Sequence, residues 1–122
     1  MLTVAGLARA ERVALPGDFY NVYGRIAIAQ MAAEDCSDLS SNDAAADAYS
    51  EAALEMAHRT TGLSYPEIAA HLESDVATEH LVLYFTDYEE RHLAQTSGAD
   101  ACQAVRDEAK RDPELRNLLE GL

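Results

Sequence analysis

Hydrophobic residues recur every three or four positions along almost the whole chain, which is the period of helices that bury one face. Turn-forming residues interrupt the pattern at Pro16-Gly17, in the polar stretch 35–43, and at Gly62, Glu73-Ser74 and Ser97-Gly98. The segments between them predict helices over residues 2–15, 19–33, 44–60, 65–72, 76–95 and 100–111, and a last turn or two from Asp112 to about Leu119. The helix over 19–33 has a wide apolar face, so we expect it at the centre. The pattern predicts a single all-α domain, residues 1–122, built as a compact bundle of six to seven helices.

Residues with strong positional preferences mark the ends of these helices. Asp18, Asp75 and Asp100 are expected N-caps, because a short carboxylate side chain can accept from the free amides of a first turn. Ser64-Tyr65-Pro66-Glu67 has the spacing of a capping box, in which serine and glutamate each bond the other's backbone amide. Gly62 follows the predicted helix over 44–60, at the position where a left-handed residue, usually glycine, often ends a helix.

The chain is strongly acidic, and this narrows the classes of partner. Its 122 residues carry 22 acids and nine bases, for a net charge of −13, which argues against a broad surface for nucleic-acid phosphates. No apolar run reaches the roughly 20 residues that span a bilayer, and the start of the chain has no signal-like pattern. Cys36 and Cys102 are too few for a disulfide framework and lack metal-ligand spacing, so we expect a cytoplasmic protein. Adaptation of the host, and not a partner, is an alternative explanation of the charge.

The segment 62–84 contains the capping box, a short turn and the start of a second helix. A helix-turn-helix pattern is matched in register by Gly62, Leu63, Ser64, Tyr65, Glu67, Ile68, Ala69, Leu72, Val76, Ala77, Thr78, Leu83 and Tyr84. This pattern resembles the helix-turn-helix of sigma-factor region 4 and of response-regulator output domains. We expect the small Ala69 to let the two helices approach, and Ile68, Leu72 and Val76 to close the wedge between them. The resemblance implies a DNA-binding transcriptional regulator.

The second helix of this motif departs from the family where DNA would be read. Glu73 replaces the usual turn glycine, and Glu79 replaces an apolar residue. The positions that would meet bases or phosphates are His80 and four carboxylates, and Arg91 is the one arginine or lysine in this helix. Because carboxylates repel phosphate, we expect no direct nucleic-acid binding by this face. The regulator alternative therefore needs a dimer with basic residues elsewhere, such as Arg106, Arg111 and Arg116.

Two Glu-x-x-His pairs give a metal-binding alternative. Glu55 and His58 lie one turn apart in one predicted helix, and Glu89 and His92 in another. Di-iron bundles use such pairs twice, together with a glutamate from each of two further helices, for which Glu34 and Glu67 are candidates. The predicted helix over 65–72 is short for such a bundle, and we expect no metal and no cofactor.

No pattern points to an active site. Cys36 follows Glu34 and Asp35 at the end of a predicted helix, an environment that disfavours a reactive thiolate, and Cys102 has no histidine close in sequence. No glycine-rich phosphate loop or nucleophile turn is present. We therefore expect a non-enzymatic protein with no catalytic residue.

The acidic residues favour a protein partner with a basic surface. We expect the binding surface at Glu73, Glu79, Asp87, Glu89 and Glu90, with further carboxylates in the loop region 34–47. In size and charge the chain is similar to small acidic phage-type inhibitors, including anti-CRISPR and other DNA-mimic proteins. That similarity implies an inhibitor that occupies a nucleic-acid-binding surface. The sequence leaves open whether the chain forms a homodimer.

Overall fold

The computed structural model describes residues 15–92 and 99–122, and this part of the chain is essentially all-α. The helices are α2 (Gly17–Asp35), α3 (Asp43–Thr61), α4 (Tyr65–Leu72), α5 (Asp75–Arg91), α6 (Ala99–Arg111) and α7 (Pro113–Arg116). Two short strands, β1 (Ser40–Ser41) and β2 (Leu119–Glu120), pair antiparallel. The helix expected over 2–15 lies outside the described residues, apart from the buried Leu15.

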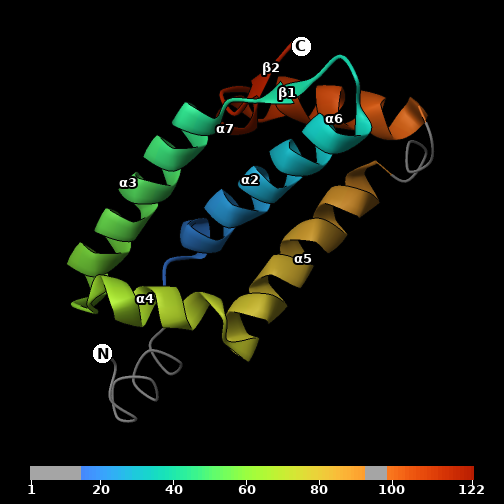
Figure 1. Cartoon of the computed structure of the whole chain (residues 1–122). Helices are drawn as coiled ribbons and strands as arrows, with labels where there is room; N and C mark the ends of the chain where they lie inside the picture. Colours follow the sequence, from blue (N-terminus) through green and yellow to red (C-terminus); the bar gives the residue numbers. More distant parts are fainter. Residues whose placement is uncertain (1–14, 93–98) are drawn as a thin grey trace.

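Helix α2 occupies the middle of the molecule, as its wide apolar face predicts. Figure 1 shows α3 on one side of it and α5 on the other, with α4 joining their lower ends. Helices α6 and α7 and the strand pair lie across the opposite end of α2. The buried side chains of α2 point in several directions, toward each of these neighbours; they are Phe19, Tyr20, Val22, Ile28, Ala29 and Ala32.

The buried side chains form two clusters along α2. One lies at the α4 end and unites Phe19 and Tyr20 with Leu63, Ile68 and Ala77. The other lies at the α6 end and joins the second half of α2 to α5, α6, α7 and β2; it comprises Ile28, Ala29, Ala32, Cys36, Leu39, Tyr88, Val105, Ala109, Leu115, Leu118 and Leu119. The C-terminal helices therefore complete a core that begins in the first described helix.

Several predicted helix ends are confirmed. Gly62 follows α3 with a φ of 74°. The capping box is formed: the Ser64 Oγ accepts from the Glu67 amide at 3.2 Å, and Glu67 Oε1 accepts from the Ser64 amide at 3.1 Å. Asp112 caps α7. These features depend on residues three or four positions apart, so the local sequence determines them.

Other boundaries differ from the predictions. Helix α2 begins at Gly17, so Asp18 lies in its first turn and does not cap it. The Ser74 Oγ accepts a hydrogen bond from the Ala77 amide and caps α5, so Asp75 lies inside that helix. Asp100 likewise follows the first residue of α6. Helix α5 ends at Arg91, before the expected limit at 95.

The two cysteines form a disulfide, contrary to their treatment as separate thiols. Cys36 follows α2 and Cys102 lies in α6, with their Cα atoms 5.9 Å apart and 66 residues between them in sequence. The partner of each cysteine is distant in the chain, so sequence spacing did not reveal the pair. The bond fixes the N-terminal part of α6 to the end of the central helix.

Candidate functional site

The outward face of α5 is acidic and partly apolar. Glu79, Asp87, Glu89 and Glu90 are exposed on it, and we call these four carboxylates, with Val82 and Leu83, the acidic face of α5. Val82 is 56% exposed and Leu83 is 60% exposed, which is high for aliphatic side chains. No described basic side chain forms an ion pair with any of the four carboxylates.

The helical period explains how this face arises. Ala77 and Tyr88 are buried and Leu81, Tyr84 and Phe85 are partly buried, so one side of α5 packs on α2. The remaining positions face outward, because residues three and four apart share a side of a helix. Arg91 turns away from the acidic face and pairs with Glu108. Arg91 therefore does not neutralise the acidic face.

Glu73, the fifth predicted binding residue, lies in the turn between α4 and α5. It is exposed, and its backbone amide donates to the carbonyl of Ala70. The structure thus brings Glu73 to the start of the helix that carries the other four carboxylates. The acidic residues of the predicted loop region 34–47 are also exposed, but Asp38 pairs with Arg106.

Helices α4 and α5 meet across the Glu73-Ser74 turn. Ile68 and Ala77 are fully buried at this junction, and Leu72 is partly buried. The expectation for Ala69 is wrong, because this residue is exposed and Ala77 is the small residue between the helices. Val76 is 38% exposed, so it does not close the wedge as Ile68 does.

A buried polar pair that the sequence analysis missed supports this junction. Tyr20 Oη and His71 Nε2 form a hydrogen bond of 2.6 Å, and both residues are buried. The ring of His80 stacks on Tyr20 at a centroid distance of 4.1 Å. His71 occupies an inward position of α4, one turn from Ile68, and that spacing was the available signal.

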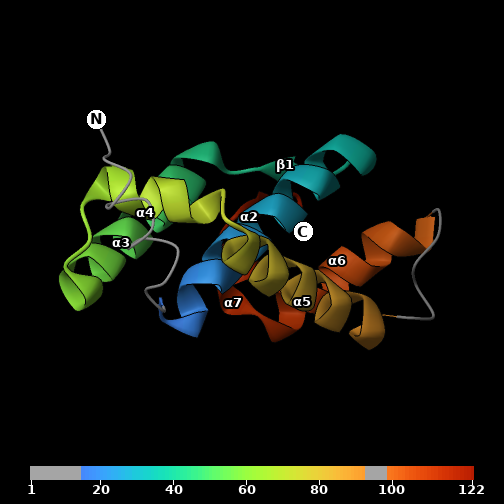
Figure 2. The same cartoon turned by 90° about the horizontal axis from the view of Figure 1, so that it is seen from below.

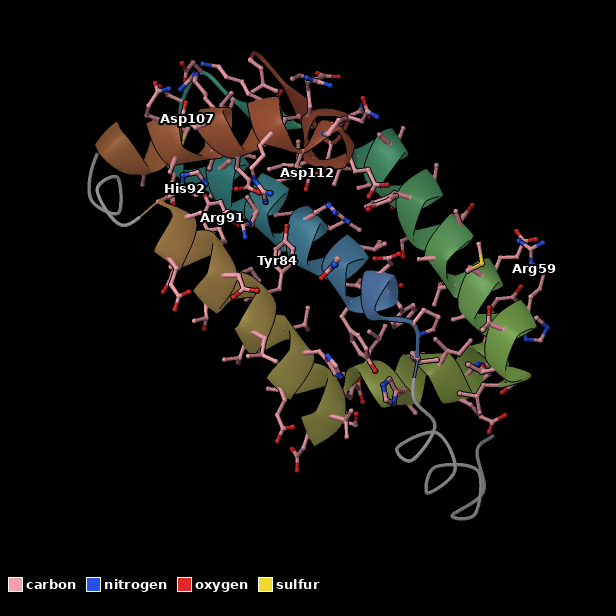
Figure 3. The ribbon with its side chains drawn as sticks, turned by 180° about the vertical axis from the view of Figure 1, so that it is seen from behind. Arg59, Tyr84, Arg91, His92, Asp107 and Asp112 are labelled. Carbon is pink, nitrogen blue, oxygen red and sulfur yellow. A yellow bond between two sulfur atoms is a disulfide. The ribbon has the colours of Figure 1, made fainter. Side chains whose placement is uncertain are left out.

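Glu108 is a second missed residue and the most constrained carboxylate among the described residues. It is fully buried, and it accepts hydrogen bonds from Arg91, His92 and Arg111. Figure 3 shows Arg91 and His92 on the side of α5 that faces α6. Burial alone would raise the pKa of Glu108, but these hydrogen bonds lower it to about 2. The signal in the sequence was its position between Val105 and Ala109 on the apolar side of α6.

The two Glu-x-x-His pairs do not come together. The ring of His58 stacks on Tyr65 of α4, whereas His92 bonds Glu108 of α6. Figure 2 shows α4 and α6 toward opposite ends of the molecule. The His58 Nδ1 donates to the carbonyl of Leu63 at 2.6 Å, and His92 bonds Glu108. Across residues 15–92 and 99–122, no group of three or more potential metal ligands is present.

The basic residues that a DNA-binding dimer would need are mostly engaged. Arg106 pairs with Asp38, and Arg111 pairs with Glu108. Arg116 is exposed and has no ion pair with a described residue. A basic surface is therefore not formed by these three residues.

Comparisons with known proteins identify no relative. No family model, no curated protein and no solved structure matches the chain. None of the described helices is both long enough and apolar enough to cross a bilayer.

Proposed function

We propose that the chain is a non-enzymatic protein that binds a basic protein partner through the acidic face of α5. The observation that carries the proposal is the set of four exposed carboxylates, without ion pairs to described residues, around the exposed Val82 and Leu83. The charges would steer a basic partner, and the two aliphatic side chains would be buried in the contact. Glu73 extends the negative charge to the start of α5.

We further propose that the partner surface normally holds nucleic acid. A row of carboxylates along a helix resembles the row of negative charges along a phosphate backbone. The net charge of −13 would also favour binding to a groove rich in lysine and arginine. Binding would then block the groove by occupying it. Duplex DNA and the chain should compete for the partner, and simultaneous binding of both would refute this part of the proposal.

The test is a comparison of two variants with the same change in charge. The first replaces Glu79, Glu89 and Glu90 by Gln and Asp87 by Asn, which neutralises the acidic face of α5. The control replaces Asp47 by Asn and Glu51, Glu55 and Glu120 by Gln; these residues are exposed, and three of them lie on α3, across α2 from α5 (Figure 1).

The binding measurement uses a partner that the wild-type chain captures from host lysate. We expect the α5 variant to bind it at least about tenfold more weakly at low ionic strength, and the α3 variant to lose much less. Equal losses in the two variants would show that only the total charge matters, and the acidic face would not be the binding surface.

The transcriptional regulator is the second candidate function, because α4, the short turn and α5 pack as consecutive helices with Ile68 and Ala77 between them. The acidity of the outward face of α5 weighs against it. Retardation of genomic DNA fragments by the purified chain at low salt would favour this candidate, and the α5 variant should then bind DNA more tightly.

The disulfide bears on the compartment in which the partner is met. Disulfides persist in oxidising compartments and are rare in the cytosol of most organisms. The bond between Cys36 and Cys102 therefore bears on both proposals: a nucleic-acid-binding partner is met in a reducing compartment, so an oxidised pair in the cell would count against that partner and against the cytoplasmic location predicted from composition. Rapid alkylation of thiols in intact host cells, followed by mass spectrometry, tests this: two alkylated cysteines would restore the cytoplasmic location.

A further inference from the structure

An apolar pocket lies where the last turns of α2 and α5 meet the first half of α6. Figure 1 shows the ends of α2 and α5 both reaching α6. The pocket has a volume of about 450 Å³, and residues of all three helices line it, among them Met31, Ala32, Tyr88, Glu89, Ala104 and Val105. That volume lies within the range of pockets that hold small ligands. The alanines of α2 and α6 leave this space open, because their side chains are short.

The floor of the pocket is part of the folded core. Ala32, Tyr88 and Val105 belong to the buried cluster at the α6 end of the molecule. The disulfide fixes the residue after α2 to α6, and the Glu108 carboxylate fixes the end of α5 to α6 through Arg91. The pocket is therefore formed before any ligand arrives, and binding would cost little further ordering of the chain.

The rim of the pocket is exposed and acidic. The apolar side chain of Met31 is 46% exposed there. Asp35 and Glu89 are exposed as well, and neither forms an ion pair with a described residue. No arginine or lysine among the described residues lines the pocket, and His92 is bonded to Glu108. An occupant that combines an apolar group with positive charge therefore suits both the floor and the rim.

The pocket adjoins the acidic face of α5. Glu89 belongs to both, because it lies at the edge of that face and also lines the pocket. Val82, seven residues before Glu89, lies on the same side of the helix, two turns away. The carboxylates, the exposed aliphatic side chains and the pocket therefore form one continuous surface. Negative charge attracts many basic surfaces alike, whereas a pocket selects those that present a fitting side chain.

We propose that this pocket holds an aromatic side chain of the basic partner, in a segment where arginine or lysine flanks that side chain. The inference rests on the proposed function, since it assigns an anchor residue to the same partner. The aromatic ring would pack on Tyr88 and His92, whose ring centroids lie 4.9 Å apart, and against the sulfur of Met31. The flanking cations would lie beside Asp35 and Glu89. Buried aromatic anchors of this kind dominate the affinity of many interfaces.

Two tripeptides of equal charge, acetyl-Arg-Trp-Arg-amide and acetyl-Arg-Ala-Arg-amide, test the pocket directly. The chain contains no tryptophan, so the fluorescence of the first peptide reports the burial of its own ring. We expect a blue shift that saturates with a Kd of the order of 1 mM. The alanine peptide, measured by NMR of the ¹⁵N-labelled chain, should bind about tenfold more weakly, because it buries no ring.

Variants that change the pocket and leave the charge unchanged extend the test to the captured partner. Ala101→Phe should fill the pocket from α6 and weaken binding of the tryptophan peptide and of the partner about tenfold. Ala69→Phe, at an exposed position of α4, is the matched control and should bind both as the wild type does. Met31→Gln changes a side chain that is 46% exposed, so this variant should fold normally and still bind the tryptophan peptide several-fold more weakly.

Two results would overturn the proposal. One is a tryptophan peptide that gives no saturable shift, or that binds no more tightly than the alanine peptide. The other is a partner that binds Ala101→Phe as tightly as the wild type while the α5 variant loses affinity, because the acidic face would then bind without an anchor in the pocket. Failure of the proposed function would look different, since the α5 variant would then keep its affinity for the partner.

Discussion

Glu108 shows how one buried side chain can decide the stability of a helix pair. It is fully buried between α5 and α6, where its carboxylate pairs with Arg91 and Arg111 and accepts a further hydrogen bond from His92. An ion pair in this position stabilises little relative to apolar packing, but removing an arginine leaves the buried Glu108 carboxylate with fewer donors, and removing Glu108 leaves the partly buried Arg91 without its acceptor. The sequence did not reveal the roles of Glu108 and His71, because Arg91 and His92 lie 17 and 16 residues from Glu108 and Tyr20 lies 51 residues from His71; only Arg111 is close to Glu108 in the chain. Their inward positions alone were visible in the helical period.

Glu108→Gln should therefore destabilise the fold. We expect a loss of about 1–3 kcal/mol in the free energy of unfolding at pH 7, measured with urea, because Arg91 and Arg111 lose their charged acceptor while water can solvate part of both side chains. The pKa of Glu108 falls from 4.5 to about 2 on folding, so its charge stabilises the fold fully above about pH 4.5 and progressively less toward pH 2. The gap between wild type and variant should be smaller at pH 3 than at pH 7. A gap that does not change with pH would contradict this account, and Glu120→Gln at the surface is the control.

Gly24 is required by the ring that packs on it. In most helix interiors, replacing glycine by alanine stabilises, by roughly 0.5–1 kcal/mol. Here the new Cβ would lie 2.3 Å from Tyr84 Cδ1, so Gly24→Ala should cost about 1–3 kcal/mol, measured by chemical denaturation. The cost should largely disappear in a Tyr84→Ala background. An equal cost in both backgrounds would show that the clash is not its source.

At the scale of elements, the caps explain why much of the helix order could be predicted. The capping box of Ser64 and Glu67 and the left-handed Gly62 act within four residues, so they are visible in the sequence. The bounds of α4 were predicted correctly for this reason. The starts of α2 and α5 were each placed late, because Asp18 and Asp75 are favourable in a first turn as well as at a cap. Which side of a helix faces the core depends on its tertiary neighbours and not only on the local sequence. Ala69 was therefore assigned to the wrong side of α4.

The capping box should contribute measurably to stability. Ser64→Ala removes the acceptor for the Glu67 amide and should cost about 1 kcal/mol in the free energy of unfolding. The matched control is Ser37→Ala, since Ser37 is exposed and forms no hydrogen bond with a described residue. If the two substitutions have the same effect, the box does not fix the start of α4.

At the scale of the molecule, the disulfide and the C-terminal helices complete the structure around α2. The bond between Cys36 and Cys102 ties residues 66 positions apart, across the core cluster that α6 and α7 share with α2. The all-α class could be predicted from the helical period. The disulfide could not, because the spacing of two cysteines in a sequence does not show whether they pair. The acidic residues of α5 were predicted one by one as a binding surface, and the structure leaves them exposed while Arg91 pairs with Glu108.

Reduction of the disulfide should lower the stability of the whole chain. A loop of this length corresponds to about 4 kcal/mol of chain entropy in the unfolded state. Dithiothreitol should therefore lower the Tm of the wild type, while a Cys36→Ala, Cys102→Ala variant should have a low Tm that the reductant leaves unchanged. Thiol analysis should first show that the disulfide is fully reduced. If the Tm of the reduced wild type then equals that of the oxidised wild type, this expectation is wrong.

The central claim is that the acidic face of α5, and not the overall charge, binds the basic partner. The most direct measurement is the Kd of the captured partner for the α5 and α3 neutralised variants, compared at low and high salt. We predict that the α5 variant binds about tenfold more weakly than the α3 variant at low salt, and that the difference shrinks as salt screens the carboxylates. Identical affinities and identical salt dependence in the two variants would contradict the account.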